Sequence, residues 1–176
     1  DIALEKYPSG NYVQADMRYF DLKQKFDAVL ITGRSTSYLI DDADLNNTFL
    51  SVHNTLENEG LFVFDCIDAE LFIPYIDKNR QVLHVSNCYP KTYERNSSWF
   101  KKPSETYDLV NWEAQYYEVK NTERILLGTD NSTFRVFTKS EITLLLKNAD
   151  FEILDLQYRK TYAFDSFVVI AKKGGK

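Results

Sequence analysis

The sequence has few cysteines, few glycines and no long apolar run. Its two cysteines, Cys66 and Cys88, form neither a metal-ligand spacing nor a disulfide framework, which favours a reducing compartment and excludes a cysteine-based metal site. We therefore expect a cytoplasmic protein without a metal. The longest apolar runs, residues 61–64 and 167–171, are much shorter than the roughly 20 residues that cross a bilayer, so no membrane contact is expected.

An excess of positive charge is also missing. Lysine and arginine total 21 against 26 aspartates and glutamates, and the basic residues are scattered, so a nucleic-acid partner is not expected. There are six glycines, and Gly10, Gly33 and Gly60 each stand alone. The sequence therefore shows no glycine-rich, phosphate-binding loop of the kind that a general nucleotide-binding module needs. Aromatic residues reach 15%, a surplus that favours a lined pocket or an interface.

Hydrophobic patterns predict an α/β fold. Residues 2–6 have the pattern of a final helical turn, and residues 11–15 alternate like a short strand. A continuous apolar stretch at 26–32 predicts a buried strand, and it is followed by an amphipathic helix over 41–58 and a second buried strand at 61–65. This order of strand, helix and strand predicts a parallel crossover unit.

The pattern changes between residues 66 and 135, where extended segments at 81–86, 107–119 and 124–127 predict an antiparallel insertion without a helix. The insertion contains the aromatic residues Trp99, Trp112, Tyr116 and Tyr117, and it could cover the first sheet or pair with another subunit. A capping-box pattern then opens a helix at Thr138, and two final strands are expected at 151–158 and 166–171. The chain is thus expected to divide into a core part (1–65), the insertion (66–135) and the closing part of the core (136–176).

Several short strings follow one another in a characteristic order: Asp16-Met17-Arg18, Phe26-Asp27-Ala28-Val29, Ser35-Thr36-Ser37-Tyr38-Leu39, the strand at 61–65, and the helix and strand start from Phe137 to Phe151. In this order they resemble the class I S-adenosylmethionine-dependent methyltransferases, and most of all the small-molecule type that includes amino-sugar N-methyltransferases. The resemblance implies a partial Rossmann-like sheet with an antiparallel β insertion between the late strand and the last helix. It also implies S-adenosylmethionine as cofactor and methyl transfer to an amine or hydroxyl of a small molecule.

The resemblance assigns one group of residues to the cofactor. Asp16, at the carboxyl end of the expected strand 11–15, would accept a hydrogen bond from the adenine amino group, and Met17 would pack near the ring. Thr32, Gly33 and Arg34 would line the methionine portion. The structural alternatives are a turn aspartate and a core methionine, and for Gly33 a simple end of the strand.

A second group is assigned to the methyl acceptor. Ser35, Tyr38 and Asp65 are expected to bind it, with Tyr38 and His84 as the candidate catalytic residues. His84 would act as a base if the insertion closes over the pocket. The alternatives are that Tyr38 packs against the following helix and that Asp65 is a solvated carboxylate at a strand end.

The sequence departs from the family in two places, because the glycine-rich first turn and the acidic residue after the second strand are not found in it. We therefore expect a fragment whose sheet has an open edge between the strands at Tyr12 and Ala28. Either an accompanying segment fills that gap or the chain forms a homodimer through its insertion strands. The competing function is a non-catalytic, self-associating interaction domain with a degenerate methyltransferase fold.

Overall fold

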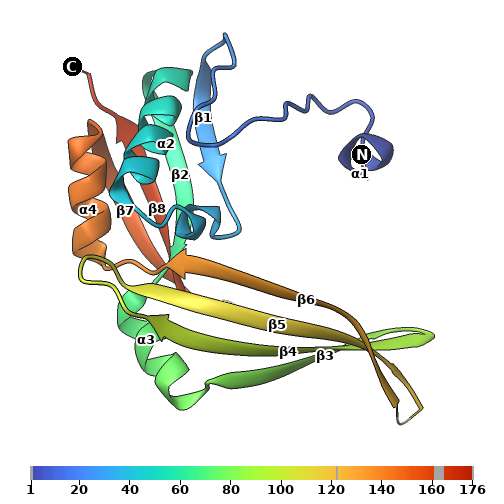
Figure 1. Cartoon of the computed structure of the whole chain (residues 1–176). Coiled ribbons are helices and arrows are strands. Elements are labelled where there is room, and N and C mark those ends of the chain that lie inside the picture. Colours follow the sequence, from blue (N-terminus) through green and yellow to red (C-terminus); the bar gives the residue numbers. More distant parts are fainter. Residues whose placement is uncertain (1, 122, 161–164, 176) are drawn as a thin grey trace.

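The computed structural model describes residues 2–121, 123–160 and 165–175, and it contains two four-stranded sheets (Figure 1). The first sheet has the strand order β1-β2-β8-β7 and the second has the order β3-β4-β5-β6. The elements are α1 (Ile2–Lys6), β1 (Phe26–Ile31), the 3-10 turn η1 (Ser35–Tyr38), α2 (Asp42–Thr55), β2 (Leu56–Ile67), α3 (Ala69–Lys78), β3 (Gln81–Cys88), β4 (Lys91–Lys102), β5 (Leu109–Lys120), β6 (Glu123–Arg135), α4 (Lys139–Asn148), β7 (Phe151–Arg159) and β8 (Ser166–Lys173). No helix of the described residues is long and apolar enough to span a membrane.

The predicted order of strand, helix and strand is confirmed, but the expected burial of the first strand is wrong, because β1 is an edge strand with no buried residue. The Asp41 side chain caps α2 by accepting a 2.8 Å hydrogen bond from the Asp44 amide, which satisfies one of the free donors at the helix start. β1 pairs in parallel with β2, and β8 and β7 extend the sheet in antiparallel fashion. The two final strands that the sequence predicts are therefore also confirmed.

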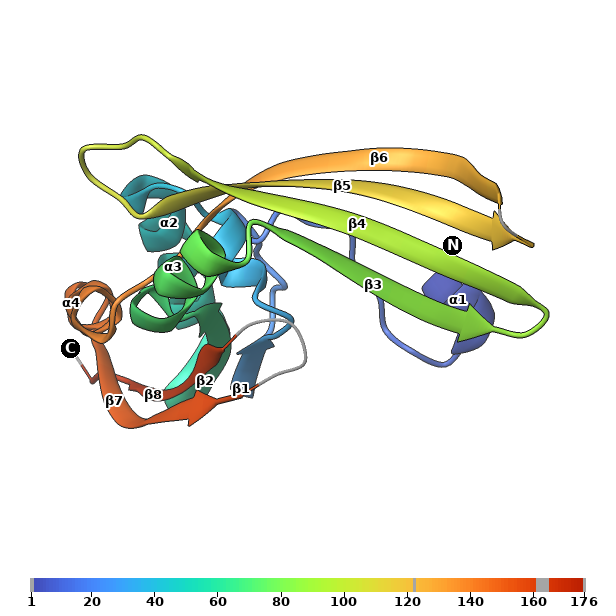
Figure 2. The same cartoon turned by 90° about the horizontal axis from the view of Figure 1, so that it is seen from below.

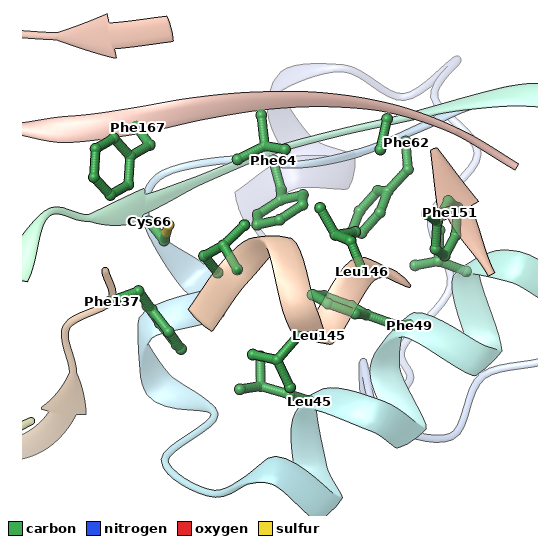
Figure 3. Close-up of a cluster of buried hydrophobic side chains, with 14 of the residues drawn as sticks. Leu45, Phe49, Phe62, Phe64, Cys66, Phe137, Leu145, Leu146, Phe151 and Phe167 are labelled. Carbon is green, nitrogen blue, oxygen red and sulfur yellow. The ribbon is translucent and has the colours of Figure 1, made fainter. Parts of the chain in front are cut away.

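The first hydrophobic core lies between this sheet and the helices α2 and α4, and it is built mainly of phenylalanine and leucine (Figure 3). The Phe49 and Phe62 rings meet edge to face with centroids 5.4 Å apart, and the Phe62 and Phe64 rings stack at 4.7 Å. Alternate residues of β2 are buried against these helices, as expected for a sheet that is covered on one face. The opposite face carries exposed apolar side chains, including Leu30 on the edge strand β1.

The second sheet packs its near end on α3 and projects its far end beyond the first sheet (Figures 1 and 2). Phe72 and Ile76 of α3 meet Trp99, Val110 and Phe134 of the sheet in a second core. The helix α3 corrects the expectation that residues 66–135 contain none. Its apolar residues have helical spacing, but Pro74 interrupts the pattern, and proline disfavours a helix interior in sequence-based reasoning. The strand β4, whose sequence is largely polar, was not expected either.

The two sheets are joined where the chain leaves the first sheet and where it returns. Ile67 and Phe137 lie side by side there, because the Phe137 amide donates to the Ile67 carbonyl at 2.9 Å and the Ala69 amide donates to the Phe137 carbonyl at 2.9 Å. Next to this crossing, Arg135 is 2% exposed and pairs with Asp42 at 2.7 Å and with Glu141 at 3.2 Å. One arginine thus connects the end of β6 to the starts of α2 and α4.

The expected strand at residues 11–15 does not form, and this prediction was wrong. The segment is irregular and its side chains are exposed. It has no neighbouring strand to pair with among the described residues, and an isolated extended segment leaves its backbone to water. The short helix before it, α1, agrees with the helical turn expected at 2–6. In α4, Thr138 and Glu141 form the predicted capping box.

Candidate functional site

A pocket of about 180 Å³ lies between the carboxyl ends of β1 and β2 and the near face of the second sheet. The turn after β1 contributes Gly33, Arg34, Ser37 and Tyr38, the end of β2 contributes Ile67, α3 contributes Tyr75, and the second sheet contributes His84, Arg95, Trp99, Trp112 and Phe134. Ligands of open α/β sheets bind at the carboxyl ends of the strands. The pocket therefore occupies the expected edge of the first sheet, and the insertion forms its opposite wall.

The turn that follows β1 has an unusual backbone. Gly33 and Arg34 both have positive φ angles, 73° and 60°, and only glycine adopts such a conformation without cost. A side chain placed on Gly33 would meet no atom within 4 Å, so the backbone here faces open space. The turn is held by Asp65, whose carboxylate accepts a 2.7 Å hydrogen bond from the Arg34 amide.

Further hydrogen bonds fix η1 after this turn. The Ser35 hydroxyl donates to the Thr32 carbonyl at 2.9 Å, and the Thr36 hydroxyl donates to the backbone carbonyl of Asp65. Tyr38 then lies at the pocket with 56% of its surface exposed. Its hydroxyl-bearing ring is thus available to a ligand, rather than packed away against the following helix.

On the insertion, His84 and Arg95 face each other across β3 and β4. Nη2 of Arg95 lies 3.4 Å from Nδ1 of His84. Because arginine only donates, this contact requires Nδ1 to accept, which places the proton of the neutral ring on Nε2. Burial, followed by the positive charge of Arg95, lowers the pKa of His84. The histidine is therefore neutral near pH 7.

The charges around the pocket are positive. Arg34 and Arg95 contribute cationic side chains, and no acidic residue lines the pocket in the part of the chain that the structure describes. The guanidinium of Arg95 also lies 5.8 Å from the centre of the Trp112 ring, a cation–π distance. The site therefore combines two cations, a neutral histidine and aromatic walls.

The structure brings four of the candidate residues together at the pocket: Gly33, Arg34, Tyr38 and His84. Thr32 and Ser35 are in the same turn and bond to each other. Asp65 lies behind the turn, where its carboxylate holds the Arg34 amide, and it is not among the described residues that line the pocket. Its observed contact is thus with the turn.

Asp16 and Met17 lie elsewhere. The strand that would have placed Asp16 at a carboxyl end is not formed, and its carboxylate accepts hydrogen bonds from Nε and Nη2 of Arg18. These bonds from Arg18 lower the pKa of Asp16 to about 2. Arg18 in turn pairs with Asp44 of α2 at 3.1 Å, and Met17 packs against the first core. The observed contacts are those of a turn aspartate and a core methionine.

Sequence reasoning missed several lining residues, chiefly Arg95, Tyr75 and Phe134. Trp99 and Trp112 stood out as aromatic residues of the insertion, but only the register, which places them opposite each other on β4 and β5, brings them to one wall. No local signal in the sequence places Arg95 beside His84, because that contact depends on the register of β3 and β4.

Comparison with known proteins supports the fold by structure rather than by sequence. No model of a known family matches the sequence, and no curated protein matches it significantly. The chain is similar to a sugar N-methyltransferase from Streptoalloteichus sp. ATCC 53650, with a TM-score of 0.77, 22% identity, and coverage of 98% of this chain and 66% of the other. It is also similar to an S-adenosylmethionine-bound amino pentose methyltransferase from Micromonospora echinaspora, with a TM-score of 0.76, 18% identity, and coverage of 98% and 68%.

A third similar structure is an S-adenosylmethionine-dependent methyltransferase from Clostridium acetobutylicum ATCC 824, with a TM-score of 0.73, 19% identity, and coverage of 99% of this chain and 69% of the other. The chain thus spans about two thirds of the length of these proteins. Its fold is that of the class I S-adenosylmethionine-dependent methyltransferases, with the antiparallel insertion that the sequence resemblance implies.

Proposed function

We propose that the chain takes part in methyl transfer from S-adenosylmethionine to an amine or hydroxyl group of a small molecule. The observation that carries this proposal is the pocket at the carboxyl ends of β1 and β2, walled by the aromatic face of the insertion. The fold is shared with solved methyltransferases, among them a sugar N-methyltransferase and an amino pentose methyltransferase. Fold alone does not define chemistry, so the pocket geometry is the main support.

The residues at the turn suit the methionine end of the cofactor. The open space at Gly33 lets a ligand approach the backbone, and the positive φ angles of Gly33 and Arg34 turn this backbone toward the pocket. We assign Thr32, Gly33 and Arg34 to this part of the cofactor, which supplies an activated methyl group when it is bound. Asp65 would act on the cofactor through the turn that it holds.

Tyr38, Ser35 and His84 are assigned to the acceptor. Methyl transfer depends mainly on orientation and on a short approach of the nucleophile, in a space from which water is excluded. Tyr38 and neutral His84 offer hydrogen bonds that can orient an acceptor, and Trp99 and Trp112 exclude water. The cations Arg34 and Arg95 disfavour an ammonium ion, so an amine would bind in its uncharged, nucleophilic form.

Calorimetric titration with S-adenosylmethionine and S-adenosylhomocysteine tests the proposal, using this chain and any longer translation product that contains it. Gly33→Val should abolish binding, because valine resists a positive φ and fills the open space. Gly128→Val is the matched control, since Gly128 is a strand residue whose added side chain also meets nothing. Absence of binding by every wild-type form, or unchanged binding by Gly33→Val, would contradict the proposal.

A second candidate function, self-association through the insertion, is favoured by the apolar side chains on its projecting part. Leu83 and Val85 of β3 and residues 125–127 of β6 are exposed. Val85 and Leu126 also lie in one row across the sheet, on strands that form its two edges. A homodimer formed there is compatible with methyl transfer.

Light scattering at several concentrations tests this second candidate. If the chain dimerises through this row, the double variant Val85→Lys/Leu126→Lys should be monomeric under conditions where the wild type is dimeric. Leu144→Lys, at an exposed position on α4, should leave the dimer intact. A wild-type monomer at every concentration would exclude this function.

A further inference from the structure

A second hollow, of about 370 Å³, continues from the pocket along the same sheet. His84 and Arg95 line both cavities, and Ser86, Tyr93, Tyr116 and Leu127 are among the other residues that line the second. We call this second hollow the outer groove. Because two residues are shared, a ligand can extend from the pocket into the outer groove without leaving the protein surface.

The strand register places the outer groove on the face that forms the pocket wall. His84, Arg95 and Tyr116 are direct neighbours across β3, β4 and β5. Tyr116 and Trp112 are both on β5 and are separated by an even number of residues, so their side chains point to the same face. Four residues of strand correspond to roughly 13 Å. Tyr116 in the outer groove therefore lies further along β5 than Trp112 in the pocket wall, on the same face of the sheet.

The chemistry of the outer groove differs from that of the pocket. Tyr93 and Tyr116 offer aromatic side chains that remain half exposed, and Leu127 adds an exposed apolar side chain. Flat aromatic rings pack against such residues in offset or edge-to-face geometry. Arg95 lines both cavities, so its guanidinium supplies hydrogen-bond donors at the place where the pocket and the outer groove meet.

We propose that the methyl acceptor is an elongated molecule that carries an aromatic ring at the end remote from the methylated atom. The reacting amine or hydroxyl lies in the pocket, an oxygen atom of the linker accepts a hydrogen bond from Arg95, and the ring lies in the outer groove on Tyr93 and Tyr116. This inference rests on the proposed function for its statement about the reacting atom. The groove itself is a property of the sheet and is tested without the cofactor.

Two probes separate the pocket from the outer groove. 4-Methoxyphenol has one ring and fills the pocket alone, whereas 4-benzyloxyphenol adds a second ring through an ether oxygen. Calorimetry at pH 7 should give a dissociation constant at least about tenfold lower for the two-ring probe, because a buried phenyl group contributes at least that much. Equal affinities, or no binding of either probe, would overturn the inference.

Two variants test whether the tighter binding of the two-ring probe depends on Tyr116. Tyr116→Ser should remove the tenfold advantage of 4-benzyloxyphenol and leave the affinity for 4-methoxyphenol unchanged. Tyr89→Ser is the matched control, because Tyr89 is fully exposed between β3 and β4 and is not among the described residues that line either cavity; it should retain the advantage. An advantage that survives Tyr116→Ser overturns the inference, with circular dichroism used to select variants that fold.

The outcome is distinguishable from that of the proposed function. If the cofactor binds but the second ring gives no advantage, methyl transfer stands and the elongated acceptor is wrong. If the advantage is present and is lost in Tyr116→Ser while no form of the protein binds cofactor, the outer groove stands as a binding site and methyl transfer is wrong.

Discussion

Replacing Arg135 should destabilise the protein more than any surface arginine does, because Arg135 connects the two sheets. Its side chain is 3% exposed, and its guanidinium pairs with Asp42 and Glu141. It also lies 3.9 Å from the centre of the Tyr107 ring. Arg135→Met keeps the apolar stem and much of the volume but removes the charge and both ion pairs.

The expected loss follows from these contacts. Removing one partner of a fully buried ion pair costs about 3–5 kcal/mol. Here the partners are not fully buried, since the side chains of Asp42 and Glu141 are 49% and 29% exposed, so water can solvate the two carboxylates that remain. We therefore expect Arg135→Met to lower the free energy of unfolding by about 2–3 kcal/mol.

Urea unfolding followed by circular dichroism measures this loss. Arg124→Met is the matched control, because Arg124 also pairs with a carboxylate, Glu94 at 2.7 Å, and stacks on a tyrosine, Tyr117 at 4.1 Å, but is 46% exposed. Exposed pairs of this kind contribute about 0–1 kcal/mol. If the two variants lose equal stability, or if Arg135→Met loses less than about 0.5 kcal/mol, the burial of Arg135 does not stabilise the connection between the two sheets.

Three other predictions concern local features. Thr138→Ala should cost about 1 kcal/mol in unfolding free energy through loss of the capping box, whereas Thr143→Ala, at an exposed position of the same helix, should cost less. The lowered pKa of His84 means that the unfolded chain binds a proton more readily than the folded chain. Stability should thus fall as the pH drops below about 6.5, and urea midpoints at pH 7.5 and 5.5 should differ less in His84→Asn. Burial raises the pKa of the Cys66 thiol, so iodoacetamide at pH 8 should label only Cys88 in the folded protein, as mass spectrometry would show; labelling of both would contradict the burial of Cys66.

The first sheet could be predicted from sequence because its signals are local. The apolar run of β1, the Asp41 cap of α2 and the capping box at Thr138 each report a structure formed by residues close in the chain. The two failures have different physical causes. Residues 11–15 alternate like a strand, but a strand needs a partner, and sequence alternation carries no information on whether one is present. In α3, Pro74 masked an otherwise helical spacing.

The candidate site could be predicted mainly on one of its two walls, and on the other wall His84 was the one catalytic candidate. Gly33, Arg34 and Tyr38 follow β1, and the rule that ligands bind at the carboxyl ends of parallel strands places them at a site without further information. The opposite wall depends on the register of four antiparallel strands, since a shift of one residue would turn Arg95, Trp99 and Trp112 to the other face. No local pattern in this sequence sets that register.

The second wall also depends on how the insertion is docked, which makes Arg135 relevant to the pocket. The wall residue Phe134 directly precedes Arg135 on β6, so a side chain that faces the ligand adjoins the one that is tied to α2 and α4. Loosening the junction would let the second sheet move relative to Gly33 and Tyr38, on the opposite wall. A misplacement of about 1 Å is enough to impair a reaction that depends on orientation.

Arg135→Met should therefore weaken binding in the pocket even without urea, when the variant is fully folded. The affinity for 4-methoxyphenol measures this effect. Unchanged affinity in a destabilised variant would show that the second sheet is positioned by its packing on α3 alone.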